Sequence, residues 1–183
     1  MNQQRNDMYI QKLILIHFVF IFMCTPFVKG QNNGKIIYEP VGYFHSAYSP
    51  QKRAPRQGSL KPDEKATIEI LPEYRDALKD LESIEYIIVL YHLNRSKDWD
   101  KLVHPGGIKT NKALGMFATR TPRRPNPIGF GVIKLDKIEN GILHVRGVDA
   151  FNGTPVLDIK PFIPSIDCPN ESKKGNTEKH LGL

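Results

Sequence analysis

Three loops of this chain combine proline with side chains that can hold an anion or a nucleotide-like ligand. The loops read APRQG at 54–58, ATRTPRRPNPIG at 118–129 and VDAFNGTPVLDIKP at 148–161. Arginine can bind a carboxylate through two parallel hydrogen bonds, and proline fixes φ, so such loops present polar groups at a low entropic cost. The polar residues that they offer are Arg56, Gln57, Arg120, Arg123, Arg124, Asn126, Asp149, Asn152, Asp158 and Lys160.

Each of these loops also fits a purely structural role. The NGTP sequence at 152–155 is typical of a turn. Arg123 and Arg124 would fit a solvated surface, and an arginine near a strand end could pair with an aspartate of the third loop. His92 ends an apolar run, where a packed histidine fits the sequence as well as a catalytic one. Taken one at a time, the loops leave both interpretations open.

Several familiar catalytic and metal-binding patterns are missing from the sequence. It contains no GxSxG, P-loop or HExxH, and GFG at 129–131 is only part of a dinucleotide-binding GxGxxG. The two cysteines, Cys24 and Cys168, form no CxxC, and no His/Cys cluster has zinc spacing, so we expect no metal site. What remains is a compact domain whose rigid, arginine-bearing loops suit an anionic or nucleotide-like ligand.

The hydrophobic pattern is mostly that of β-strands. Asn140-Gly141 predicts a tight hairpin turn, and Pro72, followed by apolar residues at helical spacing, predicts a helix over 72–82. The pattern predicts a mostly β fold, a small antiparallel-rich barrel or closed sheet with one or two short helices. Strand-like runs occupy 35–46 (an edge or irregular strand, because it contains a proline), 66–71, 84–93, 114–119, 128–139 and 142–151, with an extended segment at 153–164.

Both ends of the chain differ from this middle part. Residues 13–28 form an apolar run after two basic residues, short for a membrane span but suited to the hydrophobic part of a signal peptide. We expect residues 1–34 to be an export signal or anchor, or else an extension from an upstream start codon. We expect the globular domain over 36–167 and a polar tail at 168–183. The net charge of +7 favours an anionic partner, although a solvated surface alone would also explain it.

Three long motifs together resemble the TsaA-like (TrmO) family. They are PVGYFHSAYSPQKRAPRQG at 40–58, GMFATRTPRRPNPIG at 115–129 and NGTPVLDIKPFIP at 152–164, and the resemblance runs from about Tyr38 to Asp167. It implies a single-sheet β-barrel that acts as a homodimer. It also implies a cytoplasmic, S-adenosylmethionine-dependent tRNA methyltransferase that modifies the exocyclic nitrogen of threonylcarbamoyladenosine beside the anticodon.

The resemblance also implies which residues form the site. The acceptor nitrogen of such a substrate is conjugated to a carbonyl and is a poor nucleophile, so a base would help, and His92 and Asp149 are the candidates. Basic side chains of the loops could meet tRNA phosphates, and we expect this of Arg123, Arg124, Lys109, Lys112 and Lys52. The residues that correspond to the family's cofactor pocket are Pro55, Arg56, Gln57, His92, Leu93, Arg120, Phe130, Ala150, Phe151, Asn152 and Gly153.

This sequence departs from the family pattern in ways that keep other functions open. Leu93 stands where relatives often have a polar residue, so its contact would have to come from the backbone. Asn152 replaces an aspartate, which removes a negative charge. Bacterial members often carry an extra C-terminal domain, so RNA binding here would rest on the barrel and its dimer partner. The alternatives are a non-catalytic barrel that binds S-adenosylmethionine or RNA, and an exported or anchored protein with another ligand.

Overall fold

The computed structural model describes residue 34 and residues 36–104 and 112–168. The chain divides into two compact units, Met1–Ile37 and Tyr38–Leu183, and all the described strands belong to the second. The expected signal-like segment lies outside the described residues. In the part of the chain that the structure describes, no helix has the length and apolar character needed to cross a membrane.

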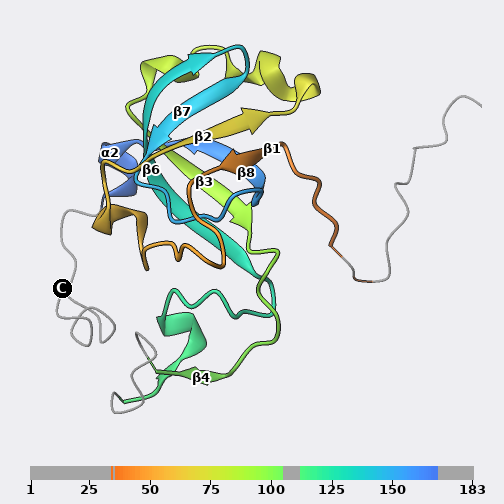
Figure 1. Ribbon diagram of the computed structural model, residues 1–183, viewed down its shortest axis with the longest axis vertical. Coiled ribbons are helices and arrows are strands. Elements are labelled where there is room, and N and C mark those ends of the chain that lie inside the picture. The colour runs from red at the N-terminus through yellow and green to blue at the C-terminus, as the bar shows by residue number, and fades with distance from the viewer. Residues whose placement is uncertain (1–33, 35, 105–111, 169–183) are drawn as a thin grey trace, which may run out of the picture. The chain divides into compact units, whose positions relative to one another are not determined.

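Within the described residues, six strands close into an antiparallel barrel (Figure 1). The barrel order is β1-β2-β7-β6-β3-β8, so the predicted fold class is confirmed. The strands are β1 (Gly42–His45), β2 (Lys65–Ile70), β3 (Tyr86–His92), β6 (Ile128–Glu139), β7 (Ile142–Arg146) and β8 (Pro155–Pro161).

A long excursion of the chain connects β3 to β6. Residues 94–127, here called the arm, contain the short strands β4 (Leu102–Val103) and β5 (Leu114–Gly115), which pair with each other and with no other described strand. His92 at the end of β3 and Ile128 at the start of β6 flank the arm, and the two residues are register partners on adjacent strands. The arm therefore leaves the barrel and returns to it at neighbouring points, and β4 lies beyond one end of the barrel (Figure 1).

The barrel interior is filled by β-branched and aromatic side chains that alternate along the strands. Residues on one face of a strand are two positions apart, and β3 follows this rule with Ile87, Val89 and Tyr91 buried. The ring of Tyr91 packs edge-on against Phe44 of β1, with ring centres 5.5 Å apart. Tyr91 also lies directly opposite Gly129 of β6, so its ring contacts both β1 and β6.

Several predicted elements are correct. The strand predicted over 128–139 has the bounds of β6, and the run at 84–93 contains β3. The predicted hairpin turn joins β6 to β7, with Asn140 at φ 51° and Gly141 at φ 80°. Positive φ at both central residues is the geometry that an Asn-Gly turn favours between twisted strands.

The strands predicted at 35–46 (an edge or irregular strand) and at 142–151 are wrong in extent. Only Gly42–His45 is a strand, and it pairs with both β2 and β8, so it is not an edge. β7 ends at Arg146 because Gly147 adopts a positive φ of 77° and turns the chain out of the sheet. The extended segment at 153–164 becomes β8, which stops at Pro161, and a short helix, α2 (Pro164–Asp167), follows it.

The predicted helix at 72–82 and the strand at 114–119 also differ from the structure. The first forms two 3-10 helices, η2 (Pro72–Leu78) and η3 (Leu81–Ser83), because Asp80 is left-handed with φ 66° and interrupts the spiral. The predicted strand at 114–119 is a strand only at β5. After β5, η5 (Met116–Ala118) leads the chain toward residues 122–125, here called the PRRP segment. A further 3-10 helix, η1 (Gly58–Leu60), follows the APRQ sequence.

The packing of Tyr91 on Gly129 gives a stability prediction. A Cβ at Gly129 would overlap the Tyr91 ring, and that ring is buried and cannot swing away. We expect Gly129→Ala to lower the free energy of unfolding by about 1–3 kcal/mol, measured by urea denaturation.

Gly131→Ala is the matched control, because it lies on the same strand and its Cβ would meet only ordinary contacts of 3.5 and 3.8 Å. Equal stability of the two variants would contradict the proposed packing.

Candidate functional site

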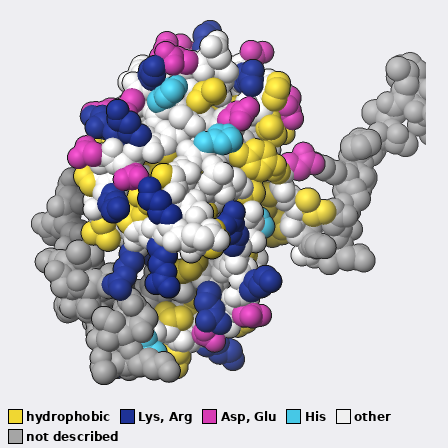
Figure 2. Space-filling model, viewed as in Figure 1, with side chains coloured by type: hydrophobic (Ala, Val, Ile, Leu, Met, Phe, Trp, Pro, Cys, Tyr) yellow, Lys and Arg dark blue, Asp and Glu magenta, His cyan; other side chains and the backbone are white. Residues whose placement is uncertain are grey.

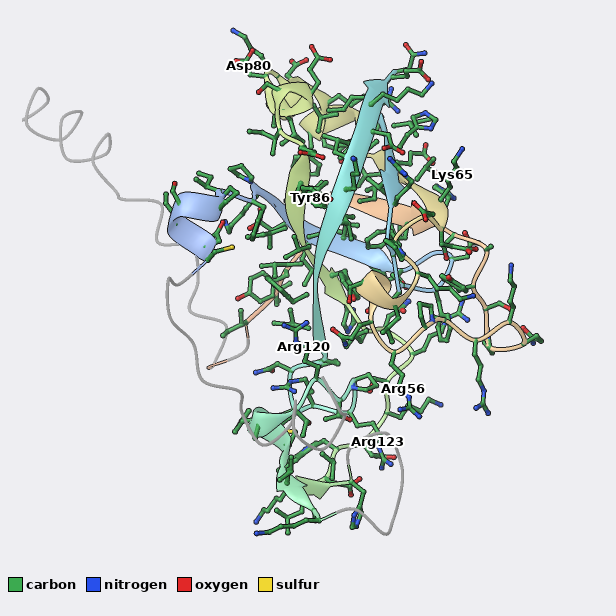
Figure 3. The ribbon with its side chains drawn as sticks, turned by 90° about the vertical axis from the view of Figure 1, so that its left-hand side faces the viewer. Arg56, Lys65, Asp80, Tyr86, Arg120 and Arg123 are labelled. Carbon is green, nitrogen blue, oxygen red and sulfur yellow. The ribbon has the colours of Figure 1, made fainter. Side chains whose placement is uncertain are left out.

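Two of the segments that carry expected cofactor residues, APRQG at 54–58 and ATRTPRRPNPIG at 118–129, are in direct contact. Arg120, in the last part of the arm, donates from Nη1 to Oε1 of Gln57 over 2.7 Å. The side-chain amide of Gln57 donates in turn to the carbonyl of Arg56 over 2.7 Å. Figure 3 shows Arg120 and Arg56 between the barrel and the outer part of the arm, where Arg123 lies. The structure therefore brings the APRQ and ATR motifs together.

Phe130 supports the Arg120 guanidinium from the strand side. Phe130 lies on β6 and its side chain is 46% exposed. The centre of the guanidinium is 5.8 Å from the centre of the Phe130 ring, a distance at which a cation is attracted to the face of the ring. Gln57 uses one of the five N–H donors of this guanidinium. Arg120 is thus held in place by an amide and a ring, and its other donors form no hydrogen bond with the described residues, so an anionic group could use them.

A second group of contacts links Asp149 to the barrel core. The Tyr91 hydroxyl donates to Oδ1 of Asp149 over 2.7 Å. Burial raises the pKa of Asp149, and the hydrogen bonds from Tyr91 and from the backbone N–H of Gly58, together with the charge of Arg120, only partly offset it. Burial, and then the charge of Asp149, raise the pKa of Tyr91, so the hydroxyl remains a neutral donor.

Gly58 allows the APRQ loop to lie directly on the segment that carries Asp149. A Cβ at Gly58 would overlap the backbone carbonyl of Gly147. Because both partners in this contact are backbone, neither can move aside without shifting a loop. The close approach fixes Gln57, the preceding residue, and so sets the position of the Arg120 guanidinium bonded to it.

The NGTP turn is held by the loop that follows β1. The Asn152 side-chain oxygen accepts from the backbone N–H of Ser46 over 3.3 Å, and the Asn152 N–H donates to the carbonyl of Tyr48 over 2.9 Å. Asn152 therefore supplies the acceptor oxygen that an aspartate would also supply. Ala150 is buried at the base of the turn, and its carbonyl accepts from the Ser46 hydroxyl over 2.8 Å.

Arg95 lies at the candidate site although its sequence position did not single it out. Its guanidinium lies 5.5 Å from the centre of the Phe151 ring and donates to the carbonyl of Asn152 over 3.3 Å. It therefore repeats, at the NGTP turn, the arginine–phenylalanine pairing seen between Arg120 and Phe130. The only sequence signal was an arginine two residues after the strand predicted over 84–93.

The two residues at the end of β3 have different surroundings. His92 is exposed, whereas the Leu93 side chain packs against the core. The backbone of Leu93 is already used on both sides, since its N–H donates to Pro127 over 2.7 Å and its carbonyl accepts from Ser96 over 2.8 Å. The expected backbone contact of Leu93 with a ligand would therefore share these groups with the arm.

The expected RNA-binding residues have separate roles in the structure. Arg123 forms an ion pair with Asp100 over 3.3 Å. Arg124 donates to the carbonyls of Thr119, over 3.0 Å, and Met116, over 3.5 Å, which ties the arm to itself. Lys112 is exposed on the arm, Lys52 lies over the Tyr48 ring on a different loop, and Lys109 lies outside the described residues.

The comparisons with known proteins agree with the resemblance found in the sequence. A family model described as the tRNA-methyltransferase O N-terminal domain matches residues 43–168. An S-adenosyl-L-methionine-binding protein of Archaeoglobus fulgidus is 42% identical over 74% of this chain and 96% of its own length. A tRNA (adenine(37)-N6)-methyltransferase of Rattus norvegicus is 36% identical over 80% of this chain.

A solved structure, a crystal structure of TrmO, has the same fold. It is 36% identical, with a TM-score of 0.65, over 77% of this chain and 64% of that chain. This chain spans 35% of the length of the rat relative. The family and the barrel fold expected from the sequence are confirmed, and the names of the relatives carry the expected cofactor and the word methyltransferase.

The Tyr91–Asp149 hydrogen bond leads to a second prediction. Tyr91→Phe removes the donor but keeps the ring, and leaves a half-buried carboxylate with one partner fewer. We expect the variant to lose about 1.5–3 kcal/mol of stability and the pKa of Asp149 to rise further, as measured by urea denaturation and by NMR titration of the carboxyl carbon.

Tyr48→Phe is the matched control. The buried hydroxyl of Tyr48 has no hydrogen-bond partner among the described residues. Its removal should leave the stability unchanged or raise it slightly, because no hydrogen bond is lost. A larger loss for Tyr48→Phe than for Tyr91→Phe would contradict the role given to Asp149.

Proposed function

Since the chain belongs to the tRNA-methyltransferase O family, we propose that it is an S-adenosylmethionine-dependent tRNA methyltransferase. We propose that its target is the exocyclic nitrogen of threonylcarbamoyladenosine beside the anticodon. The observation that carries the proposal is the Arg120 guanidinium, held by Gln57 and Phe130, beside the point where Asp149 of the third loop accepts a hydrogen bond from the N–H of Gly58 in the first. A fixed guanidinium can pair with a carboxylate. An exposed aromatic ring beside it can pack against a sulfonium or an adenine. S-adenosylmethionine has all three groups.

The residues around this cation suit S-adenosylmethionine. We propose that Arg120 and Arg56 hold its carboxylate, and that Phe130 and Phe151 lie against its adenine or sulfonium. When bound, the cofactor supplies a methyl group on a positively charged sulfur. The backbone of the 150–153 turn and the side-chain amide of Asn152 can form hydrogen bonds with the edge of the adenine. The remaining proposed pocket residues are Pro55, Gln57, His92, Leu93, Ala150, Asn152 and Gly153.

The protein's own residues would contribute by positioning and by accepting a proton. Transfer of a methyl group from a sulfonium neutralises charge, so orientation and exclusion of water can supply much of the rate. We propose Asp149 as the first candidate base, because burial raises its pKa and so makes the carboxylate a better proton acceptor. His92, exposed at the end of β3, is the second candidate.

We propose that tRNA and a second copy of the chain are the macromolecular partners. Arg123, Arg124, Lys109, Lys112 and Lys52 would hold the tRNA phosphates. An apolar strip on the outer face of the barrel supports the homodimer. The strip comprises Tyr86 of β3 and Ile128, Phe130 and Val132 of β6, and all four side chains are exposed in the single chain. Because Phe130 belongs to both the strip and the proposed cofactor pocket, dimerisation would cover one side of that pocket.

We propose a cytoplasmic protein whose TsaA-like domain covers residues 36–167, followed by a polar tail at 168–183. Residues 1–34 would then be an extension, because the cofactor and tRNA are intracellular. N-terminal sequencing of the natural protein tests this proposal. A mature chain that starts at Gln31 in a secreted fraction would contradict it.

The pocket assignment predicts the effect of removing its cation. Arg120→Ala should weaken binding of S-adenosylmethionine by about 10- to 100-fold, because a charge-assisted hydrogen bond is worth about 1.5–3 kcal/mol. Arg56→Ala should weaken it in the same direction. Isothermal titration calorimetry measures both.

The control for these variants is Lys79→Ala, an exposed cation beside Asp80, which Figure 3 shows at the other end of the barrel from Arg120. Unchanged affinity in both arginine variants would overturn the pocket.

The substrate and the base are tested by methyl transfer to two tRNAs, one carrying threonylcarbamoyladenosine and one carrying plain adenosine at the same position. We expect methylation of the first only, detected by mass analysis of the nucleosides.

If Asp149 is the base, the rate should rise as pH rises through its raised pKa, because only the ionised carboxylate accepts a proton.

Asp149→Asn should abolish this rise, whereas His92→Gln should keep it. Cofactor and tRNA binding without methylation of either tRNA would instead favour the non-catalytic barrel.

A further inference from the structure

The arm contains most of the molecule's excess positive charge. Residues 94–127 include eight lysines and arginines and two aspartates, a net charge of +6, whereas the whole chain has +7. The barrel and the other segments are therefore close to neutral. Figure 2 shows Lys and Arg side chains on the lower part of the visible face, where Figure 1 places the arm. A positive segment of this kind attracts polyanions.

The same arm exposes two large aromatic side chains. Phe117 is 84% exposed and Trp99 is 46% exposed. Neither belongs to the hydrophobic core of the barrel. Exposed aromatic rings among cations are the combination found in proteins that bind unpaired nucleotides, where the rings stack on bases and the cations hold phosphates.

Phe117 is held in a defined position. The Arg124 guanidinium lies 5.7 Å from the centre of the Phe117 ring. That guanidinium is itself fixed by hydrogen bonds to the carbonyls of Thr119 and Met116. Arg124 therefore covers part of the ring from a fixed place, and the high exposure of Phe117 leaves the rest of the ring surface to solvent. A ring ordered in advance loses less entropy when a base stacks on it.

Trp99 and Phe117 belong to the same end of the β4–β5 ladder. Leu102 pairs with Gly115, and the Met116 N–H donates to the carbonyl of Lys101 over 2.9 Å, which continues the ladder toward both aromatic residues. The ion pair between Arg123 and Asp100 ties the PRRP segment to the residue that follows Trp99. Sequence positions that are far apart thus converge on one part of the arm.

We propose that Trp99 and Phe117 form a stacking site for unpaired nucleobases of RNA, with the described lysines and arginines of the arm outside the cofactor pocket holding the adjacent phosphates. This proposal rests on the proposed function, because it names the part of the tRNA, a single-stranded loop, that the arm contacts. Paired bases already stack on their neighbours and offer no free face, so a double helix would use only the cations. Trp99 and Phe117 would hold the single-stranded RNA loop. The proposed cofactor pocket at the end of β3 would then methylate one base of that RNA loop.

Trp99 offers a direct measurement, because it is the only tryptophan in the chain. The probe is a synthetic RNA hairpin with a loop of unpaired nucleotides, and the control is a duplex RNA of equal length without a loop. We expect the hairpin to quench Trp99 fluorescence and to bind more tightly than the duplex. Equal binding and equal quenching by the two RNAs would overturn the stacking site in favour of phosphate contacts alone.

Substitutions of Phe117 separate stacking from apolar contact. Phe117→Ala should weaken hairpin binding by about 5- to 100-fold, the range found for loss of one base–aromatic stack. Phe117→Leu keeps an apolar side chain without a ring and should bind as weakly, whereas Phe117→Tyr should bind like the natural protein. Full binding by Phe117→Leu, or tight binding to anionic lipid vesicles that depends on Trp99, would overturn the proposal.

Calorimetry with S-adenosylmethionine keeps this test separate from the test of the proposed function. Phe117→Ala and Trp99→Ala should bind the cofactor with unchanged affinity, because neither residue belongs to the proposed pocket. If the natural protein bound hairpins through Trp99 but methylated no tRNA, the proposed function would fail and the stacking site would stand. If it methylated tRNA and Phe117→Ala bound hairpins unchanged, the stacking site would fail and the proposed function would stand.

Discussion

The hydrogen bond between the Tyr91 hydroxyl and the Asp149 carboxylate joins the barrel core to the loops outside it. On the core side, Tyr91 packs on Phe44 and fills the space that the missing side chain of Gly129 leaves. On the loop side, Asp149 accepts a hydrogen bond from the N–H of Gly58. Gly58 in turn lies directly against the backbone carbonyl of Gly147. The position of the Arg120 guanidinium follows from this chain of contacts, so the interior packing and the proposed pocket depend on one another.

The arginines of the PRRP region show how differently neighbouring cations can be used. Arg120 is bonded to Gln57, Arg123 pairs with Asp100, and Arg124 binds the backbone of its own loop. Their spacing in the sequence predicts only a basic, rigid segment. Their partners decide which cation can still meet a ligand, and those partners come from the arm and from the APRQ loop.

Local pattern predicted much of the fold, and distant contacts account for the rest. β6 and the Asn140-Gly141 turn depend on neighbouring residues, so the sequence predicted them well. The barrel closes through the pairing of β1 with β8, and Asp149 contacts Tyr91, which is 58 positions away. Both contacts join distant segments, and hydrophobic periodicity does not encode such pairing. The three proline-bearing loops stand out in the sequence because each has an unusual composition, and the structure places them in contact through Arg120 with Gln57 and Asp149 with Gly58. Arg95 was missed because a single arginine after a strand carries little signal.

The way the arm is attached to the barrel has a consequence for how such proteins can diversify. Its two ends begin beside His92 and Ile128, which are register partners on adjacent strands. The barrel therefore requires only that the chain return to a point about one strand spacing away, ~4.8 Å. The outer part of the arm can lengthen, shorten or change sequence without altering any barrel pairing. The barrel therefore sets where the arm begins and ends, while the outer part of the arm is free of any barrel pairing within the described residues.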